Sequence, residues 1–368
     1  MNPAIPYVDL VTQHRKLLPE LMEAIEKVLL SGNFILGEAV SEFEERFSQY
    51  VGARYAVGVA DASEGLLLAL KAVGVRSGDE VIVPANSFLS SAASVAALGA
   101  VPVFIDTADD LNLDVSQIES LINKKTKAIM PVHLTGRAAD MKPIMELARK
   151  HGLRVVEDAA QAVGAKYFEK AVGNFGDVGV FSMHPLKNLG ACGDGGCIVT
   201  NDSDIHSFLR QARNNGLKNR DECEFWSIHS RLDSIQAAIL NVKLKYLDAW
   251  TAQRRAHAKI YQSKLSKYVE TPVDLPHQFA VYEKFVIQSD HRDSLQAYLK
   301  DQQVATAIHY PIPLHLQKAA QIPGYQALSL PRCERQTKRI LSLPVYQWLS
   351  QEQVESISEQ IATYFERL

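Results

Sequence analysis

The sequence predicts an α/β protein with a large, mostly parallel sheet domain and a smaller C-terminal α/β domain. Strand-like and helix-like segments alternate from about residue 55 to residue 200, which is typical of a parallel sheet covered by helices. The chain has 368 residues, more than a single hydrophobic core usually supports. A second strand–helix–strand pattern follows residue 250, so we expect a large domain over 1–250 and a small one over 251–368.

Two amphipathic helices are expected before the first strand. Apolar residues recur there at helical spacing, and Pro19 is expected in the first turn of the first helix. The apolar positions are Leu18, Leu21, Ile25 and Val28, then Val40, Phe43 and Phe47. Between the helices, the apolar segment around Phe34 lies between two glycines and could reach over a pocket or pack into the core.

The central part of the chain supplies the sheet. Short apolar runs separated by turn residues predict strands at 80–83, 101–105, 128–132, 153–156, 178–181 and 196–200. Helical patterns at 87–98, 115–122, 142–151 and 205–213 have the length that right-handed crossovers need. A long amphipathic helix through 235–246 is expected to bridge the two domains, and the small domain is expected to contain strands at 281–288 and 304–308 around a helix at 292–300.

Composition excludes several classes of function. Apolar residues make up 47% and charged residues 22%, ordinary values for a globular enzyme, and a net charge of -3 offers no basic stripe for nucleic acid. No apolar run approaches membrane-spanning length and no secretory leader pattern is present, so we expect a cytoplasmic protein. The four cysteines have no C-x-x-C spacing and are expected to be reduced. No His or Cys spacing indicates a metal site.

The most informative chemical feature is a lysine that follows one strand and an aspartate that ends another. The acidic pair Glu157-Asp158 follows the strand at 153–156, and Lys187 follows the strand at 178–181. Ligands of open α/β sheets bind outside the carboxyl ends of the strands, so both side chains are expected in one crevice. Lysine can hold a carbonyl cofactor such as pyridoxal phosphate (PLP), and a carboxylate can keep its ring nitrogen protonated. Considered alone, Asp158 would be better interpreted as a helix cap and Lys187 as a solvated loop residue. The presence of both residues favours a cofactor site.

Neighbouring segments supply the other groups that PLP requires. Ala62 and Ser63 precede an apolar helix whose start could hold a phosphate, although Ser63 could also be an ordinary N-cap. Phe88 follows the strand at 80–83 and could stack on a flat ring or belong to the core. Gln161 lies one turn after Asp158 on the same side.

These segments resemble one family. The motifs Glu157-Asp158-Ala159-Ala160-Gln161, His184-Pro185-Leu186-Lys187 and Gly193-Asp194-Gly195-Gly196 are similar to those of the DegT/StrS family of nucleotide-sugar aminotransferases, and the resemblance covers nearly the whole chain. It implies a fold-type I PLP-dependent transferase that works as a homodimer with shared active sites. It also implies L-glutamate as the amino donor. The stretch around His309 and Tyr310 looks more like members that aminate a 3-keto sugar than like those that aminate C4.

The resemblance implies roles for individual residues. Lys187 would be the catalytic residue and carry the internal aldimine, Asp158 would face the pyridine nitrogen, Phe88 the ring face and Gln161 the phenolic oxygen. Ala62, Ser63, Ser182 and, across the subunit interface, His229 would hold the phosphate. The substrate-side residues would be Phe34, His184, Arg231, His309 and Tyr310. Three positions depart from the family pattern, namely Asp61-Ala62-Ser63 for Asn-Gly-Thr, Leu186 for Ser or Thr, and His229 for Asn.

The function expected from these residues is ping-pong transamination of a nucleotide-linked keto-deoxyhexose or keto-hexosamine, for polysaccharide or glycoside biosynthesis. Related sugar dehydratases have a histidine where Lys187 stands, so Lys187 favours transamination. A PLP-dependent sugar dehydratase on the same fold and a non-catalytic regulatory homologue remain the alternatives. The sequence does not distinguish dTDP from UDP.

Overall fold

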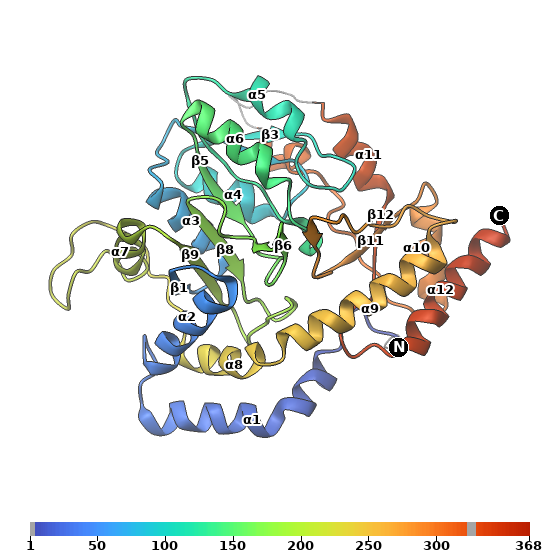
Figure 1. The fold of residues 1–368 in the computed structure, drawn as a ribbon, viewed down its shortest axis with the longest axis horizontal. Coiled ribbons are helices and arrows are strands. Elements are labelled where there is room, and N and C mark those ends of the chain that lie inside the picture. The colour runs from blue at the N-terminus through green and yellow to red at the C-terminus, as the bar shows by residue number, and fades with distance from the viewer. Residues whose placement is uncertain (1–3, 322–328) are drawn as a thin grey trace.

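A seven-stranded sheet forms the centre of the molecule (Figure 1). The protein is described here by a computed structural model that covers residues 4–321 and 329–368. In spatial order the strands are β1 (Tyr55–Val59), β9 (Gly196–Thr200), β8 (Val178–Ser182), β5 (Arg154–Asp158), β4 (Thr126–Ile129), β2 (Glu80–Pro84) and β3 (Val101–Ile105). Neighbouring strands are parallel except at β9, which is antiparallel to both β8 and β1. The mostly parallel sheet predicted from the sequence is therefore confirmed.

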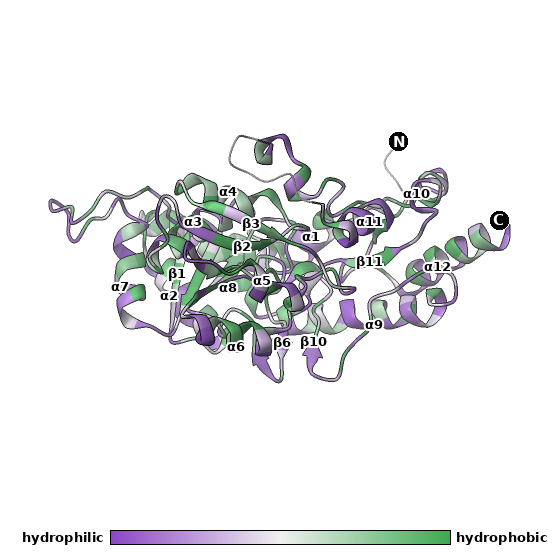
Figure 2. Cartoon of the chain, turned by 90° about the horizontal axis from the view of Figure 1, so that it is seen from above, coloured by the Kyte–Doolittle hydropathy of each residue, from purple (hydrophilic) through white to green (hydrophobic). Residues whose placement is uncertain are grey.

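Helices cover both faces of this sheet because successive strand residues point to opposite sides. Ile82 and Phe181 pack in one hydrophobic core, whereas their neighbours Val83 and Val180 pack in the other. The first face is covered by α1 (Leu10–Ser31), α2 (Glu38–Val51), α6 (Met141–His151) and α8 (Ser234–Leu244). The second face is covered by α3 (Ala62–Ala72), α4 (Leu89–Ala97) and α7 (Ser203–Ala212). Figure 2 shows the strands as largely hydrophobic ribbons between helices with one polar side.

Helix α1 begins earlier than the sequence predicts. Asp9 caps it by accepting a hydrogen bond from Thr12 N at 2.9 Å, so the helix starts at Leu10. Pro19 therefore lies inside the helix, and the prediction that it belongs to the first turn is wrong. A proline there removes one intrahelical hydrogen bond, and α1 bends along its length (Figure 1).

The smaller α/β unit is reached through α8 and α9 (Leu247–Leu265), which follow each other almost without a break (Figure 1). This unit contains a two-stranded antiparallel sheet and two further helices around their own hydrophobic core. The elements are β11 (Phe285–Gln288), β12 (Ile340–Leu343), α10 (Arg292–Asp301) and α12 (Gln351–Glu366). We keep residue 250 as the proposed domain boundary; α9 crosses it, and Ile5 packs in the core of the C-terminal unit.

The expected strand at 304–308 does not form. Val304 and Ala307 make only isolated bridges, to Ile5 and to Ser342. The ladder position beside β11 is taken by β12, which pairs with all four of its residues, from Phe285 to Gln288. The strand that pairs with β11 thus comes from a distant part of the chain, which the local pattern could not reveal.

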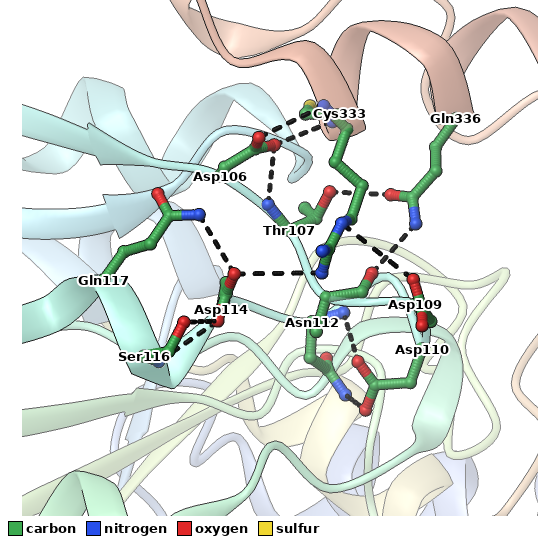
Figure 3. Close-up of polar contacts among 12 residues, drawn as sticks. Asp106, Thr107, Asp109, Asp110, Asn112, Asp114, Ser116, Gln117, Cys333 and Gln336 are labelled. Carbon is green, nitrogen blue, oxygen red and sulfur yellow. Dashed lines mark hydrogen bonds and ion pairs between the residues drawn. The ribbon is translucent and has the colours of Figure 1, made fainter.

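Helix α11 (Pro331–Arg339) holds the C-terminal unit against the end of β3 (Figure 3). Asp106, directly after β3, accepts hydrogen bonds from the backbone N–H groups of Arg332 and Cys333 in the first turn of α11. Gln336, one turn later, accepts a hydrogen bond from the Thr107 hydroxyl at 2.6 Å. A small three-stranded sheet of β6 (Lys166–Tyr167), β7 (Lys170–Ala171) and β10 (Gln278–Phe279) lies at another edge.

Candidate active site

A cavity of about 490 Å³ opens at the carboxyl ends of the parallel strands, where such folds bind their ligands. β5 ends at Asp158 and the neighbouring β8 ends at Ser182, and both residues line the cavity. Lys187 comes from the turn after β8 and lines the same cavity. The structure therefore brings together the aspartate and the lysine on which the sequence-based prediction depends.

Asp158 is nearly enclosed but has few hydrogen-bond donors. Its carboxylate accepts one bond from the Ser91 hydroxyl at 2.7 Å and one from the Ala160 N–H at 3.1 Å. Burial raises the pKa of this carboxyl, and the Ser91 bond and the Lys187 charge only partly oppose the rise. A cationic group placed against Asp158 would relieve the cost of burying the carboxylate.

The adjacent Glu157 has a different environment because it points to the other side of β5. It accepts hydrogen bonds from the backbone N–H groups of Gly173, Phe175 and Gly176 at 2.6–2.8 Å. It also accepts one from His133 Nε2 at 3.0 Å, since His133 Nδ1 is occupied by the Ala139 N–H. Glu157 thus fixes a loop, and of the acidic pair only Asp158 reaches the cavity.

The start of α3, where the sequence predicts a phosphate site, forms part of the cavity wall. Ala62 and Ser63 line it, and the Ser63 and Ser90 hydroxyls lie 2.6 Å apart. Ser182, from the end of β8, lines the same region, and its hydroxyl accepts a bond from the His184 N–H at 3.3 Å. Hydroxyls of three serines are therefore available to an anion.

Asp61 is the N-cap of α3 and occupies backbone donors at the start of this helix. Its carboxylate accepts from the N–H groups of Ser63 and Glu64 at 2.6 and 3.0 Å, so two of the free donors at the helix start are already paired. A side chain at Gly196 would lie 2.6 Å from the Asp61 backbone, so the close approach of β9 requires glycine there. The departure from the family pattern thus leaves the serine hydroxyls as the free polar groups at this helix start.

Aromatic and amide groups cover the opposite side of the cavity. Phe88 precedes the first residue of α4, is 52% exposed and lines the cavity, so the alternative that it belongs to the core does not hold. The Gln161 side chain accepts a hydrogen bond from the Thr135 N–H at 2.7 Å and donates one to the Tyr310 hydroxyl at 3.1 Å. Burial and nearby carboxylates raise the pKa of Tyr310, which therefore stays protonated.

His309 and His184 also line the cavity. His309 Nδ1 lies 2.9 Å from the Ser342 hydroxyl, and its ring stacks on Tyr7. Burial, assisted by the Lys284 charge, lowers the pKa of His309 to about 3, so this imidazole is neutral at physiological pH.

Three predicted residues lie outside the cavity. Arg231 donates to the Asn214 side chain at 3.2 Å, and exposed His229 pairs with the Asn214 backbone. Phe34 is 43% exposed, and its carbonyl accepts from the Ser234 N–H. Contact of these residues with the cofactor or substrate of a second subunit stays a prediction.

The cavity lining also includes residues that the sequence did not single out, among them Tyr7, Arg254, Glu283 and Lys284. Glu283 and Lys284 form a buried ion pair, and Arg254 donates to the carbonyls of Tyr282 and Glu283 at 3.3 and 3.4 Å. The available signal was a charged pair inside the apolar run 281–288. Tyr7 and Arg254 lie in segments with no comparable signal.

The donor set of the cavity fits pyridoxal phosphate. The lining contains an amine, a buried carboxylate, serine hydroxyls and an aromatic ring, which are the groups that this cofactor requires. In residues 4–321 and 329–368 no group of three or more His, Cys, Asp or Glu side chains could hold a metal ion. No helix within the same ranges is long and apolar enough to cross a membrane.

Comparison with known proteins gives a consistent result. The family described as "DegT/DnrJ/EryC1/StrS aminotransferase family" matches residues 16–362. A "Pleiotropic regulatory protein" of Geobacillus stearothermophilus is 43% identical over 98% of both chains. A "dTDP-3-amino-3,4,6-trideoxy-alpha-D-glucose transaminase" of Streptomyces venezuelae is 38% identical, over 100% of this chain and 98% of its own. A "UDP-N-acetyl-3-dehydro-alpha-D-glucosamine 3-aminotranferase" of Acidithiobacillus ferrooxidans is 41% identical over 98% of both.

Solved structures agree with these sequence relatives. S. venezuelae DesV "in complex with ketimine intermediate" superimposes with a TM-score of 0.97 at 38% identity, covering 100% of both chains. The Bacillus subtilis protein NtdA "with bound cofactor pmp" has a TM-score of 0.89 at 30% identity, over 95% of this chain and 82% of that one. The cavity chemistry and these matches together make the chain a PLP-dependent aminotransferase, and it belongs to the DegT/DnrJ/EryC1/StrS aminotransferase family.

Proposed function

We propose that this enzyme transfers an amino group from L-glutamate to the C3 keto group of a nucleotide-linked keto-deoxyhexose or keto-hexosamine. The observation on which this depends most is that Lys187 and Asp158 line one cavity. Relatives named for 3-amino sugars linked to dTDP and to UDP support the choice of C3. Nothing in the cavity favours one of these nucleotides over the other.

Each cavity residue has a task in this reaction. When bound, PLP supplies an electron sink for the charge that develops on the substrate carbon. Lys187 provides the amine that binds the cofactor carbonyl, and its free Nζ then carries a proton to and from the substrate. Asp158 holds the ring nitrogen protonated, and Phe88 covers the ring.

The remaining polar groups position the cofactor. Gln161 is fixed by the Thr135 N–H and presents its amide beside the Tyr310 hydroxyl, at the side expected for the phenolic oxygen. Ser63 and Ser182 supply hydroxyls for the phosphate. Asp61 adds a negative charge nearby, so we expect weaker phosphate binding than a neutral loop would give.

We further propose that the enzyme is a cytoplasmic homodimer with shared active sites. Helix α1 supports this because a second apolar stripe faces away from the core, with Val11, Leu18, Met22 and Leu29 each more than half exposed. A stripe of this kind is suited to a second copy of the chain. Light scattering coupled to size-exclusion chromatography would measure the mass.

The function is tested by two half-reactions. Wild-type enzyme loaded with PLP should release 2-oxoglutarate from L-glutamate and should then aminate a dTDP- or UDP-linked 3-keto sugar. Lys187→Ala should lower turnover at least about a thousandfold without loss of fold. No 2-oxoglutarate from a folded, loaded enzyme would overturn the proposal, and loss of water from the sugar without gain of nitrogen would favour the dehydratase.

A regulatory role is the second candidate because one relative is named a pleiotropic regulatory protein. The catalytic groups in the cavity favour an enzyme, and the two roles predict different results for Lys187→Ala. If the variant retains every measurable property of the wild type, the non-catalytic role is supported. If it loses turnover, the enzyme is supported.

A further inference from the structure

The buried ion pair of Glu283 and Lys284 has no task in the chemistry above. Both side chains are almost fully enclosed, at 8% and 6% exposure, and both line the cavity just before β11. The only charged partner of the Lys284 ammonium within the described ranges is its neighbour Glu283. A lysine with one adjacent partner keeps two further N–H groups for a ligand.

Arg254 makes this side of the cavity positive. It is 5% exposed, its Nη1 is held by the carbonyls of Tyr282 and Glu283, and its buried Nε has no hydrogen-bond partner in the part of the chain that the structure describes. Lys284 pairs with the Glu283 carboxylate and Arg254 is bound to the Glu283 backbone, so two cations lie beside one carboxylate. Because an uncompensated buried charge is costly, an anionic ligand would be stabilised here.

The proposed function places two very different substrates in this cavity in turn. The amino donor has carboxylates, whereas the keto-sugar ring presents hydroxyls. We propose that Lys284 binds a carboxylate of the amino-acid donor and returns to Glu283 when the sugar occupies the cavity. The pair would then determine which donors are accepted, an inference that rests on the proposed function.

The chemistry of the three groups suits such an exchange. Lys284 is a compact charge on a flexible stem and can change partner, whereas Arg254 is fixed by two carbonyls. Glu283 competes with the donor carboxylate for Lys284. Removing the lysine should therefore weaken carboxylate binding, and neutralising the glutamate should strengthen it.

Binding of glutarate, which is glutamate without its amino group, tests this directly. Titration calorimetry would compare wild-type holoenzyme with Lys284→Met, Lys284→Arg and Glu283→Gln, with neutral glutaramide as the control ligand. We expect Lys284→Met to weaken glutarate binding at least about tenfold and Lys284→Arg to restore most of it. Glu283→Gln should tighten binding several-fold, and glutaramide should not distinguish the variants. The cofactor absorption spectrum confirms that each protein is folded and loaded.

Opposite effects of the two neutralising substitutions would support the proposal. Equal glutarate binding by wild type and Lys284→Met would overturn it, and so would equal weakening by Lys284→Met and Glu283→Gln, because the pair would then be structural only. Sugar amination is measured separately. Wild-type enzyme that binds glutarate as expected but fails to aminate any keto sugar would overturn the proposed function and not this inference.

Discussion

Two aspartates at the carboxyl ends of parallel strands are equally buried but accept different numbers of hydrogen bonds. Asp106 and Asp158 are each 4% exposed, and each lies at the carboxyl end of a parallel strand. Asp106 accepts three backbone hydrogen bonds, from Thr107, Arg332 and Cys333, at 2.7–3.1 Å (Figure 3). Asp158 accepts only one backbone bond and one hydroxyl bond. The protein itself supplies the hydrogen-bond donors of the Asp106 carboxylate, whereas the Asp158 carboxylate can accept further hydrogen bonds from a ligand.

The polar groups around the two aspartates also differ in whether they have hydrogen-bond partners. Beside Asp106, Gln336 accepts from the Thr107 hydroxyl and donates to the Ala108 carbonyl, so its amide is paired at both ends. In the described part of the cavity wall, by contrast, Arg254 Nε is buried without a hydrogen-bond partner. The polar groups around Asp106 are therefore paired with one another, whereas the cavity wall keeps a buried donor that a ligand could use.

Asp158→Asn should have the largest effect, and it should separate function from stability. Loss of the anion that we propose for the ring nitrogen should lower turnover by about 100-fold or more. Because burial raises the pKa of Asp158, the ionised carboxylate destabilises the cofactor-free fold once the pH exceeds the unfolded pKa, and asparagine removes that cost. Steady-state kinetics and thermal unfolding of cofactor-free protein measure the two effects. A clear drop in the melting temperature of the cofactor-free variant would contradict the comparison.

Asp106→Asn should give the opposite result. An asparagine keeps one acceptor oxygen and turns an NH2 group toward a backbone N–H, so at least one buried donor loses its partner. We expect the free energy of unfolding to fall by about 2 kcal/mol. Chemical denaturation measures this loss, and turnover at low temperature should stay near the wild-type value. Equal stability of the two proteins would show that the bonds to α11 contribute little.

The sequence was informative about one of these regions because local patterns determine it. Asp158, Ser182 and Lys187 follow apolar strand-like runs, and the topology of parallel sheets places the ends of such runs together. The same reasoning placed the sheet and most of its helices. The motif of the lysine segment then indicated the cofactor.

Long-range competition explains what the sequence did not reveal. The segment 304–308 has a strand-like pattern, yet β12 occupies the position beside β11. Tyr7 reaches the cavity by stacking on His309, more than 300 positions away in the numbering, and no spacing rule relates the two. Phe34 and Arg231 lie outside the cavity of one chain, so their predicted role depends on a second copy.

The pH dependence of carboxylate binding sharpens the comparison at the cavity. Burial lowers the pKa of Lys284 to about 8, so the lysine is a cation below that pH and neutral above it. Glutarate affinity should therefore fall by about tenfold between pH 7 and pH 9. Calorimetry of wild-type holoenzyme across this range measures the fall, and Lys284→Met should show a flat profile.

The other groups facing Lys284 do not account for this change. Glu283 has a lowered pKa, because the attraction of Lys284 and Lys187 outweighs its burial, and it stays ionised across the range. The pKa of Arg254 is lowered by burial only to about 10, and that of His309 is about 3, so neither charge changes greatly. Lys187 is the proposed attachment point of the cofactor and is present in both proteins, so it does not distinguish the wild type from Lys284→Met. An unchanged pH profile in Lys284→Met would contradict the assignment.

Arg332→Ala should have the smallest effect, although Arg332 lies in the same network as Asp106. Its guanidinium is 3.9 Å from Asp109 and 3.7 Å from Asp114, and the Asp109 side chain is fully exposed, so solvent screens the pair. We expect the free energy of unfolding to change by less than about 1 kcal/mol. Alanine keeps the backbone N–H that donates to Asp106, so the variant removes the ion pairs and leaves the buried bond intact. Chemical denaturation of Arg332→Ala and Asp106→Asn therefore separates the contribution of the ion pairs from that of the buried hydrogen bond. If Arg332→Ala lost as much free energy of unfolding as Asp106→Asn, the arginine side chain, and not the backbone donor, would hold α11 to the sheet.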